Sequence, residues 1–130
     1  MGKVMIDTNV LIELLEKEPL ERLEKLAASY EFYISGIVAF EFLVGIYRTG
    51  KIKLKELLEE FFVIVPVTYD IITKAAQIEA DLMKVGKMLE PRDTIIAATA
   101  IVLGIPLWTK NMQDFSRLKK YGLTLAKIEK

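Results

Sequence analysis

Apolar residues follow two alternating patterns along the chain, short continuous runs and longer stretches with helical spacing. Four short runs are typical of strands, at residues 3–6, 31–35, 62–67 and 105–109. Residues 123–128 could add a fifth strand at one edge. Because the runs alternate with helical stretches, the pattern predicts an α/β fold, with a parallel four- to five-stranded sheet between two helical layers.

Two short helices are predicted after the first strand. Their apolar faces consist of Val10, Leu11, Leu14 and Leu15 in the first, and of Leu20, Leu23, Leu26 and Ala27 in the second. Thr8 or Asn9 can cap the first helix, and Pro19 suits the first turn of the second. Each helix is expected to bury its apolar face.

Four further helices are predicted in the rest of the chain. They cover residues 37–47, 52–61, 68–85 and 94–103. Gly50 and Gly86 are expected to end the first and the third of them. The last helix, which Asp93 opens, is apolar nearly all round, so we expect it in the interior, flat against the sheet.

The length of 130 residues fits one domain, which we expect to span residues 1–130. No apolar run reaches the ~18 residues that a membrane helix needs, because Gly104 and Pro106 interrupt the longest candidate. The first residues show no cleavable signal pattern, and the chain has no cysteine. These features predict a cytoplasmic protein without disulfides.

Histidine is absent as well, which removes several classes of active site. The chain can form no Ser-His-Asp triad, no Cys-His pair and no zinc site built from cysteine and histidine. Carboxylate, lysine, hydroxyl and metal chemistry remain. With 18 basic and 18 acidic residues, the formal charge is zero, so net charge gives only a weak indication of nucleic-acid binding.

Four acidic residues, Asp7, Glu41, Asp93 and Asp114, each interrupt or end an apolar stretch. An ionised carboxylate in a largely dry site needs a cation, hydrogen bonds or a proton. Asp7 and Asp114 follow predicted strands, and the carboxyl ends of parallel strands meet at one edge of a sheet. If the fold gathers all four acids, a divalent metal ion would satisfy them.

Each acid also has a structural interpretation. Asp7, Asp93 and Asp114 stand where carboxylates commonly cap helices, and Arg92 is available to neutralise Asp93. Glu41 is harder to explain in this way, because its neighbours on the predicted helix include no basic residue. Spacing alone therefore leaves capping and catalysis both open.

Taken in order, four motifs resemble those of PIN-domain ribonucleases, most closely the VapC-like toxins of VapBC toxin-antitoxin pairs. The motifs are Asp7-Thr8-Asn9, residues 35–45 around Glu41, residues 91–100 around Asp93, and residues 109–115. The resemblance implies an α/β/α fold with a Mg²⁺ or Mn²⁺ site that hydrolyses RNA to products with a 5′-phosphate and a 3′-hydroxyl. It also implies a homodimer that a small VapB-like antitoxin inhibits.

The resemblance assigns the catalytic and metal-binding acids position by position. Asp7, Glu41 and Asp93 match the three best-defined acids of the family. The last motif places a carboxylate where this chain has either Asn111 or Asp114, and we favour Asp114 as the acid and Asn111 as a supporting amide.

Supporting and substrate-binding residues are expected beside these acids. Thr8 and Thr109 match hydroxyl positions that support the family's site. Arg92, Lys110 and Arg117 are the basic candidates for RNA phosphate, since arginine can grip a phosphate with two donors and lysine supplies a point charge.

Partner surfaces and other functions stay open at this point. Residues 52–61 and 83–88 could form a dimer or antitoxin groove, although core packing explains most of their apolar residues. One alternative function is a non-catalytic PIN-like domain that binds RNA or protein. Another is an aspartate-based phosphatase or phosphoacceptor domain, which Asn9 disfavours because such a phosphatase needs a second aspartate there.

Overall fold

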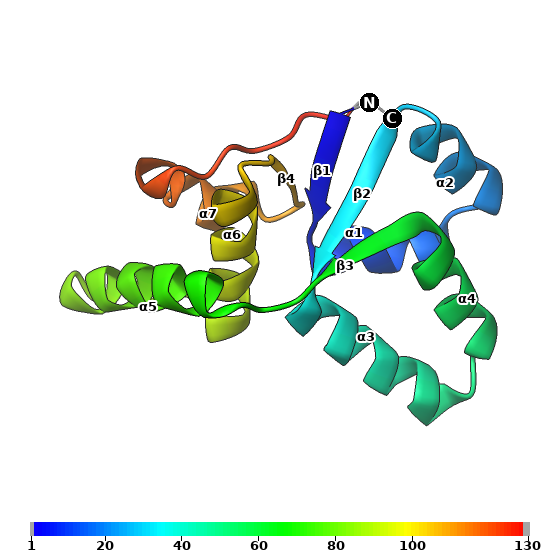
Figure 1. Cartoon of the computed structure of the whole chain (residues 1–130), viewed down its shortest axis with the longest axis horizontal. Helices are drawn as coiled ribbons and strands as arrows, with labels where there is room; N and C mark the ends of the chain where they lie inside the picture. Colours follow the sequence, from blue (N-terminus) through cyan, green and yellow to red (C-terminus); the bar gives the residue numbers. More distant parts are fainter. Residues whose placement is uncertain (1, 129–130) are drawn as a thin grey trace.

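The computed structural model describes residues 2–128 of the chain. Within them, parallel strands form a four-stranded sheet in the order β3-β2-β1-β4 (Figure 1). The strands are β1 (Gly2–Ile6), β2 (Tyr30–Ser35), β3 (Phe62–Val65) and β4 (Leu107–Trp108). The predicted α/β class and the parallel sheet are confirmed.

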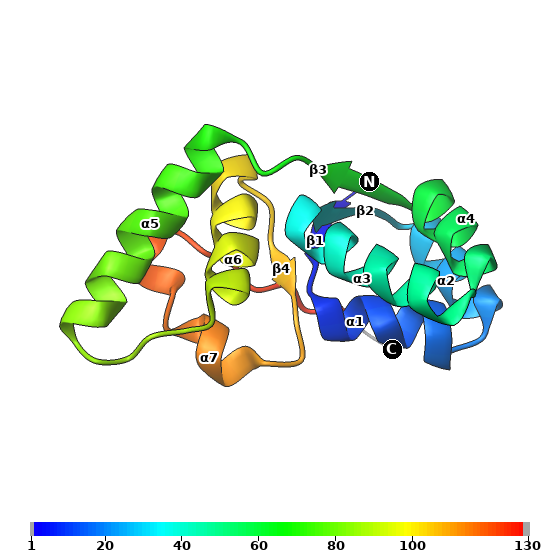
Figure 2. The same cartoon turned by 90° about the horizontal axis from the view of Figure 1, so that it is seen from below.

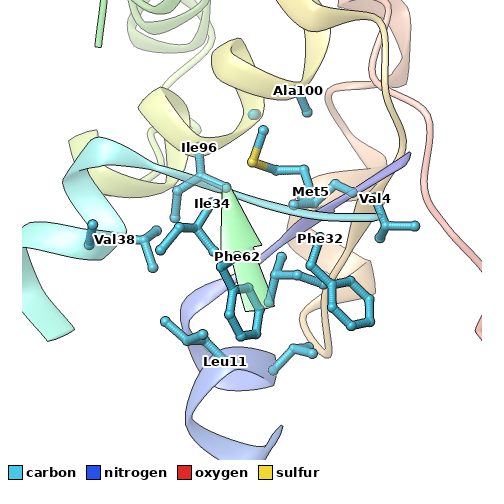
Figure 3. Packing of buried hydrophobic residues seen from close by; sticks show 14 of the residues in the cluster. Val4, Met5, Leu11, Phe32, Ile34, Val38, Phe62, Ile96 and Ala100 are labelled. Atoms are coloured by element: carbon cyan, nitrogen blue, oxygen red, sulfur yellow. The ribbon is translucent and has the colours of Figure 1, made fainter. Parts of the chain in front are cut away.

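Helices cover both faces of this sheet. Figure 2 shows α5 (Tyr69–Lys84) and α6 (Pro91–Leu103) on one side, and α1 (Thr8–Ile12), α2 (Leu20–Ala27), α3 (Gly36–Thr49) and α4 (Ile52–Phe61) on the other. In the core, Met5 points toward Ala100 of α6, whereas Phe32 and Phe62 point toward Leu11 of α1 (Figure 3). The rings of Phe32 and Phe62 stack with centroids 5.6 Å apart. The predicted three layers are therefore present.

The first helix begins one residue earlier than a cap at Thr8 or Asn9 would place it, so that prediction is wrong, whereas the interpretation of Asp7 as a capping residue is confirmed. Asp7 is the N-cap, because its carboxylate accepts a hydrogen bond from the backbone N–H of Thr8. The helix continues into a π-helical segment, η1 (Glu13–Lys17). In α2, Leu23 is buried as predicted, but Leu20 is exposed because it is the first residue of the helix.

Glycine and hydroxyl residues set the ends of the longer helices. Ser35 caps α3 through its Oγ atom, and Gly50 ends it with a φ of 76°, a left-handed conformation that favours glycine. Thr68 caps α5 in the same manner. Helix α6 starts at Pro91, so Asp93 lies inside its first turn and does not open it. Its residues Ile96 to Ala100 are buried, as predicted for an interior helix.

Three predicted strands are shorter in the structure, and one of them is β4, which covers only residues 107–108 of the predicted 105–109. Strand β3 ends at Val65, because Pro66 has no N–H to donate to a neighbouring strand. The expected strand at residues 123–128 is reduced to one parallel bridge between Leu107 and Leu125. There Leu107 N donates to Thr124 O and Ala126 N donates to Leu107 O, both at 2.8 Å. Because β4 has only two residues, residues 123–128 have no longer strand with which to pair.

The last helical segments follow β4, as α7 (Met112–Ser116) and η2 (Lys119–Tyr121). Within residues 2–128, no helix combines the length and the apolar character that crossing a membrane requires.

Candidate active site

Asp7 is buried at the carboxyl end of β1, with 4% of its surface exposed. Its backbone N–H donates to Trp108 O at 3.0 Å, which fixes the ends of β1 and β4 side by side. Its Oδ1 accepts from the backbone N–H of Thr8 at 2.8 Å, and its Oδ2 accepts from Thr109 Oγ at 2.7 Å. The carboxylate is thus held in one orientation by two threonines, the residues predicted to support it.

A chain of hydrogen bonds leads from Thr109 to Asp114. Thr109 Oγ accepts from the backbone N–H of Asn111 at 2.9 Å. The side-chain amide of Asn111 then donates to Asp114 Oδ2 at 3.0 Å. Asp114 is therefore connected to Asp7 through two intervening residues, and Asn111 orients the acid.

Asp93 lies half-buried in the first turn of α6. Burial raises the pKa of its carboxyl group, the positive charge of Arg92 lowers it, and the negative charge of Asp7 raises it further, with a net upward shift. The negative charge of Asp7 contributes to this shift, although Asp7 and Asp93 lie 86 positions apart in the sequence.

Glu41 lies on α3 and its side chain is 39% exposed. Arg92 of α6 approaches it, with Nη1 at 3.5 Å from Glu41 Oε1. Glu41 therefore does have a basic partner, although its neighbours on its own helix include none. Its local neighbours could not show this, because the partner comes from a helix on the other side of the sheet (Figure 2).

The three basic residues predicted to bind substrate all have acidic partners. Arg92 lies near Glu41, Asp93 and Glu90, Lys110 contacts Glu13, and Arg117 lies 4.0 Å from Asp114. Arg117 also donates to the backbone oxygen of Lys87 at 3.1 Å. Each of the three basic side chains therefore lies beside acidic residues, and each is already paired with at least one of them.

Sequence reasoning missed Glu13 and Glu90 as members of this charged region. Glu90 precedes the first helical residue of α6, where a carboxylate is favoured, so its position offered a signal. Glu13 offered none, because its partner Lys110 lies almost a hundred positions away.

A groove opens beside the acids, and Thr8, Glu41 and Arg92 contribute to its lining. Its apolar part comes from Phe42, Ile46 and Leu54. Thr8 Oγ is buried and has no hydrogen-bond partner among the residues that the structure describes. A buried hydroxyl without a partner needs a water molecule or a ligand.

The donor atoms of this region are carboxylate, amide and hydroxyl oxygens, which suit hard divalent cations. Across residues 2–128, however, no three acids are close enough to hold a metal ion as they stand. Glu41 pairs with Arg92, and Asp114 pairs with Asn111. The residue types fit a divalent cation, and the full set of four acids as its ligands stays a prediction.

Comparisons with known proteins agree on one family. The sequence model of the PIN domain matches residues 4–121. A ribonuclease VapC1 of Methanocaldococcus jannaschii is 38% identical over 124 residues, covering 95% of this chain and 87% of that protein. A VapC ribonuclease of Pyrococcus furiosus is 31% identical over 129 residues, covering 98% and 87%.

Two solved VapBC structures contain a chain with the same fold. A chain of the DNA-bound VapBC of Salmonella typhimurium aligns with a TM-score of 0.80 and 25% identity, covering 97% of this chain and 98% of that one. A chain of VapBC-1 from Haemophilus influenzae aligns with a TM-score of 0.79 and 26% identity, covering 96% and 97%.

Proposed function

This chain belongs to the PIN-domain family, among the VapC ribonucleases, and we propose that it is a metal-dependent endoribonuclease, the toxin of a VapBC-like pair. Its substrate is RNA and its reaction is hydrolysis of the phosphodiester bond. Because RNA is the substrate, we place its action in the cytoplasm. The proposed nuclease unit spans residues 1–130.

The observation that carries this proposal is the buried carboxylate of Asp7, which two threonines hold at the carboxyl end of β1 and whose negative charge also acts on Asp93. Asp7 is fixed by Thr8 and Thr109 at the end of β1, and Asp93 comes from the buried helix α6. Two carboxylates in a half-dry site repel each other, which costs stability unless a cation joins them. A structural role for both acids would not require this arrangement.

We assign the cation to Asp7, Glu41, Asp93 and Asp114, with Asn111 and the unpartnered hydroxyl of Thr8 as supporting oxygen donors. Mg²⁺ or Mn²⁺, when bound, would offset the charge that builds on the phosphate and would make water a better nucleophile. The four acids are proposed as both catalytic and metal-binding residues.

The protein's own groups orient the reaction. Each oxygen of Asp7 accepts one hydrogen bond and keeps a second lone pair for a ligand. Thr109 and Asn111 hold Asp7 and Asp114 in fixed orientations. Arg92, Lys110 and Arg117 stand at the rim of the acids and are proposed to contact the RNA phosphates.

A VapB-like antitoxin is the proposed partner, as in the VapBC complexes named above. We also propose that two copies of the chain pair. Phe40, Val44 and Tyr47 lie along one face of α3, and each is at least half exposed. Exposed apolar residues that form a continuous stripe of this kind are typical of a surface that contacts another protein.

Cleavage of single-stranded and structured RNA by the purified protein tests the enzyme proposal. We expect cleavage with Mg²⁺ or Mn²⁺, none with chelator, and loss of activity in Asp7→Asn and Asp93→Asn. Asp81→Asn is the matched control, because Asp81 is exposed on α5. A 2′-deoxy nucleotide at the cleaved bond should leave cleavage intact, since water attacks and not the 2′-hydroxyl.

Two results would contradict the proposal. Cleavage that persists in chelator, or in both aspartate variants, would remove the metal mechanism. RNA binding without cleavage under every metal condition would instead support the non-catalytic PIN-like alternative.

A further inference from the structure

Arg92 is surrounded by carboxylates from two elements. Its Nη1 lies 3.5 Å from Glu41 Oε1, its Nε lies 3.6 Å from Asp93 Oδ1, and its Nη2 lies 3.7 Å from Glu90 Oε2. Glu90 and Asp93 are neighbours in sequence, whereas Glu41 comes from α3. The guanidinium therefore bridges the two helices that carry Glu41 and Asp93.

These contacts are ion pairs without close hydrogen bonds. All three distances exceed the ~3.2 Å limit of an ordinary N–H···O bond. Arg92 Nε is buried and has no hydrogen-bond partner among the residues that the structure describes. A guanidinium that is held by charge, and not by a two-donor grip on one carboxylate, can be exchanged for another cation at low cost.

The charges around Arg92 favour its position in the absence of metal. Glu41, Asp93 and Glu90 each place a carboxylate oxygen at 3.5–3.7 Å from the guanidinium. Without the guanidinium, Glu41 and Asp93 would lose the positive charge that lies beside both of them. The arginine thus offsets part of the repulsion that the acids create.

We propose that Arg92 is a built-in counter-ion, which competes with the divalent cation for Glu41 and Asp93 and so sets the affinity of the site for metal. This inference rests on the proposed function, because it takes these two acids as ligands. A bound metal ion would release the arginine from both carboxylates, and its guanidinium would then be available to an RNA phosphate.

Titration of Mn²⁺ alone into the full-length protein, followed by calorimetry, tests the inference. Arg92→Gln removes the competing charge. Because Mn²⁺ then no longer has to displace the two ion pairs of Arg92 with Glu41 and Asp93, we expect it to bind about tenfold more tightly. Arg92→Lys keeps the charge, so it should stay near the wild-type affinity. Arg48→Gln is the matched control, because Arg48 lines the same groove without an ion pair within residues 2–128. The affinity of this variant for Mn²⁺ should equal that of the wild type.

A structural role for Arg92 gives the opposite result. If Arg92 only held the carboxylates in place, Arg92→Gln would bind Mn²⁺ equally or more weakly, and the inference would be overturned. Equal tightening in Arg48→Gln would also overturn it, because the effect would then come from general charge. In either case RNA cleavage by the wild type would leave the proposed function standing, whereas a folded wild type that binds no Mn²⁺ would remove both.

Hydrogen exchange at Arg92 Nε provides a test in the wild-type protein, independent of whether the glutamine variant folds. The Nε–H signal is assigned by its loss in Arg92→Lys. Release from the carboxylates should speed its exchange as Mg²⁺ is added. Exchange that slows or stays constant while Mg²⁺ binds would overturn the inference.

Discussion

Replacing Thr109 with valine removes one hydroxyl while keeping the shape of the side chain. In the structure this hydroxyl donates to Asp7 Oδ2 at 2.7 Å and accepts from the N–H of Asn111 at 2.9 Å. Thr109 and Asp7 are 5% and 4% exposed, so water cannot easily replace the lost partner. The substitution leaves a buried carboxylate oxygen and a backbone N–H each short of one hydrogen bond.

The expected cost follows from these two losses. Hydrogen bonds to charged groups contribute about 1.5–3 kcal/mol, and the loss at Asp7 is of this kind. For a chain of this length, about 1 kcal/mol lowers Tm by roughly 3–5 °C, so Thr109→Val should lower it by roughly 5–15 °C. Thr109→Ser, which keeps the hydroxyl, should recover most of this loss.

Urea and thermal unfolding of the two variants, with chelator present, measure the difference. The same valine substitution in an Asp7→Asn background should cost less, about 1 kcal/mol, because the charge that strengthened the bond is gone. Equal stability of the valine and serine variants would refute the reasoning. So would an equal cost in both backgrounds, because Thr109 would then act independently of Asp7.

Two further predictions concern Asp93 and the apolar stripe of α3. The pKa of Asp93 is raised, so its stabilising contribution is present below its unfolded value of about 4 and is lost as pH rises through the higher folded value. Without metal, the free energy of unfolding of Asp93→Asn in urea should therefore equal that of the wild type at low pH. It should become larger than that of the wild type toward neutral pH, and a difference that does not change with pH would contradict this. Phe40→Glu should convert dimers to monomers in light scattering, because it places a charge on the exposed stripe. Leu20→Glu, on the exposed start of α2, should leave the mass unchanged, and a Phe40→Glu dimer would exclude this face as the contact.

Most of the fold could be predicted from local patterns in the sequence. The apolar runs and the glycines at positions 50 and 86 located the strands and helix ends because these signals act over a few residues. The cap of α1 was left open between Asp7 and the two residues after it, because Asp7 is both the end of a strand and a helix cap, and the sequence cannot separate the two roles. The edge position of β3, with Val63 and Ile64 exposed, was hidden by its apolar composition.

The site was predictable as a set of residues and not as a set of contacts. The motifs singled out Asp7, Asp93 and Thr109, and the structure shows a direct contact between Asp7 and Thr109. The pairing of Glu41 with Arg92 could not be predicted, because ion pairs between distant helices leave no periodic or local trace. Charge partners of this kind appear only when the topology is known.

The position of Thr109 has a consequence for the order of folding. The hydroxyl that orients Asp7 lies 102 positions away from it in the sequence. The strand before that hydroxyl is in turn held by backbone bonds to Thr124 and Ala126. Because contacts between remote positions cost more loop-closure entropy than local ones, we expect the orientation of Asp7 to be fixed late in folding, after the local helices have formed.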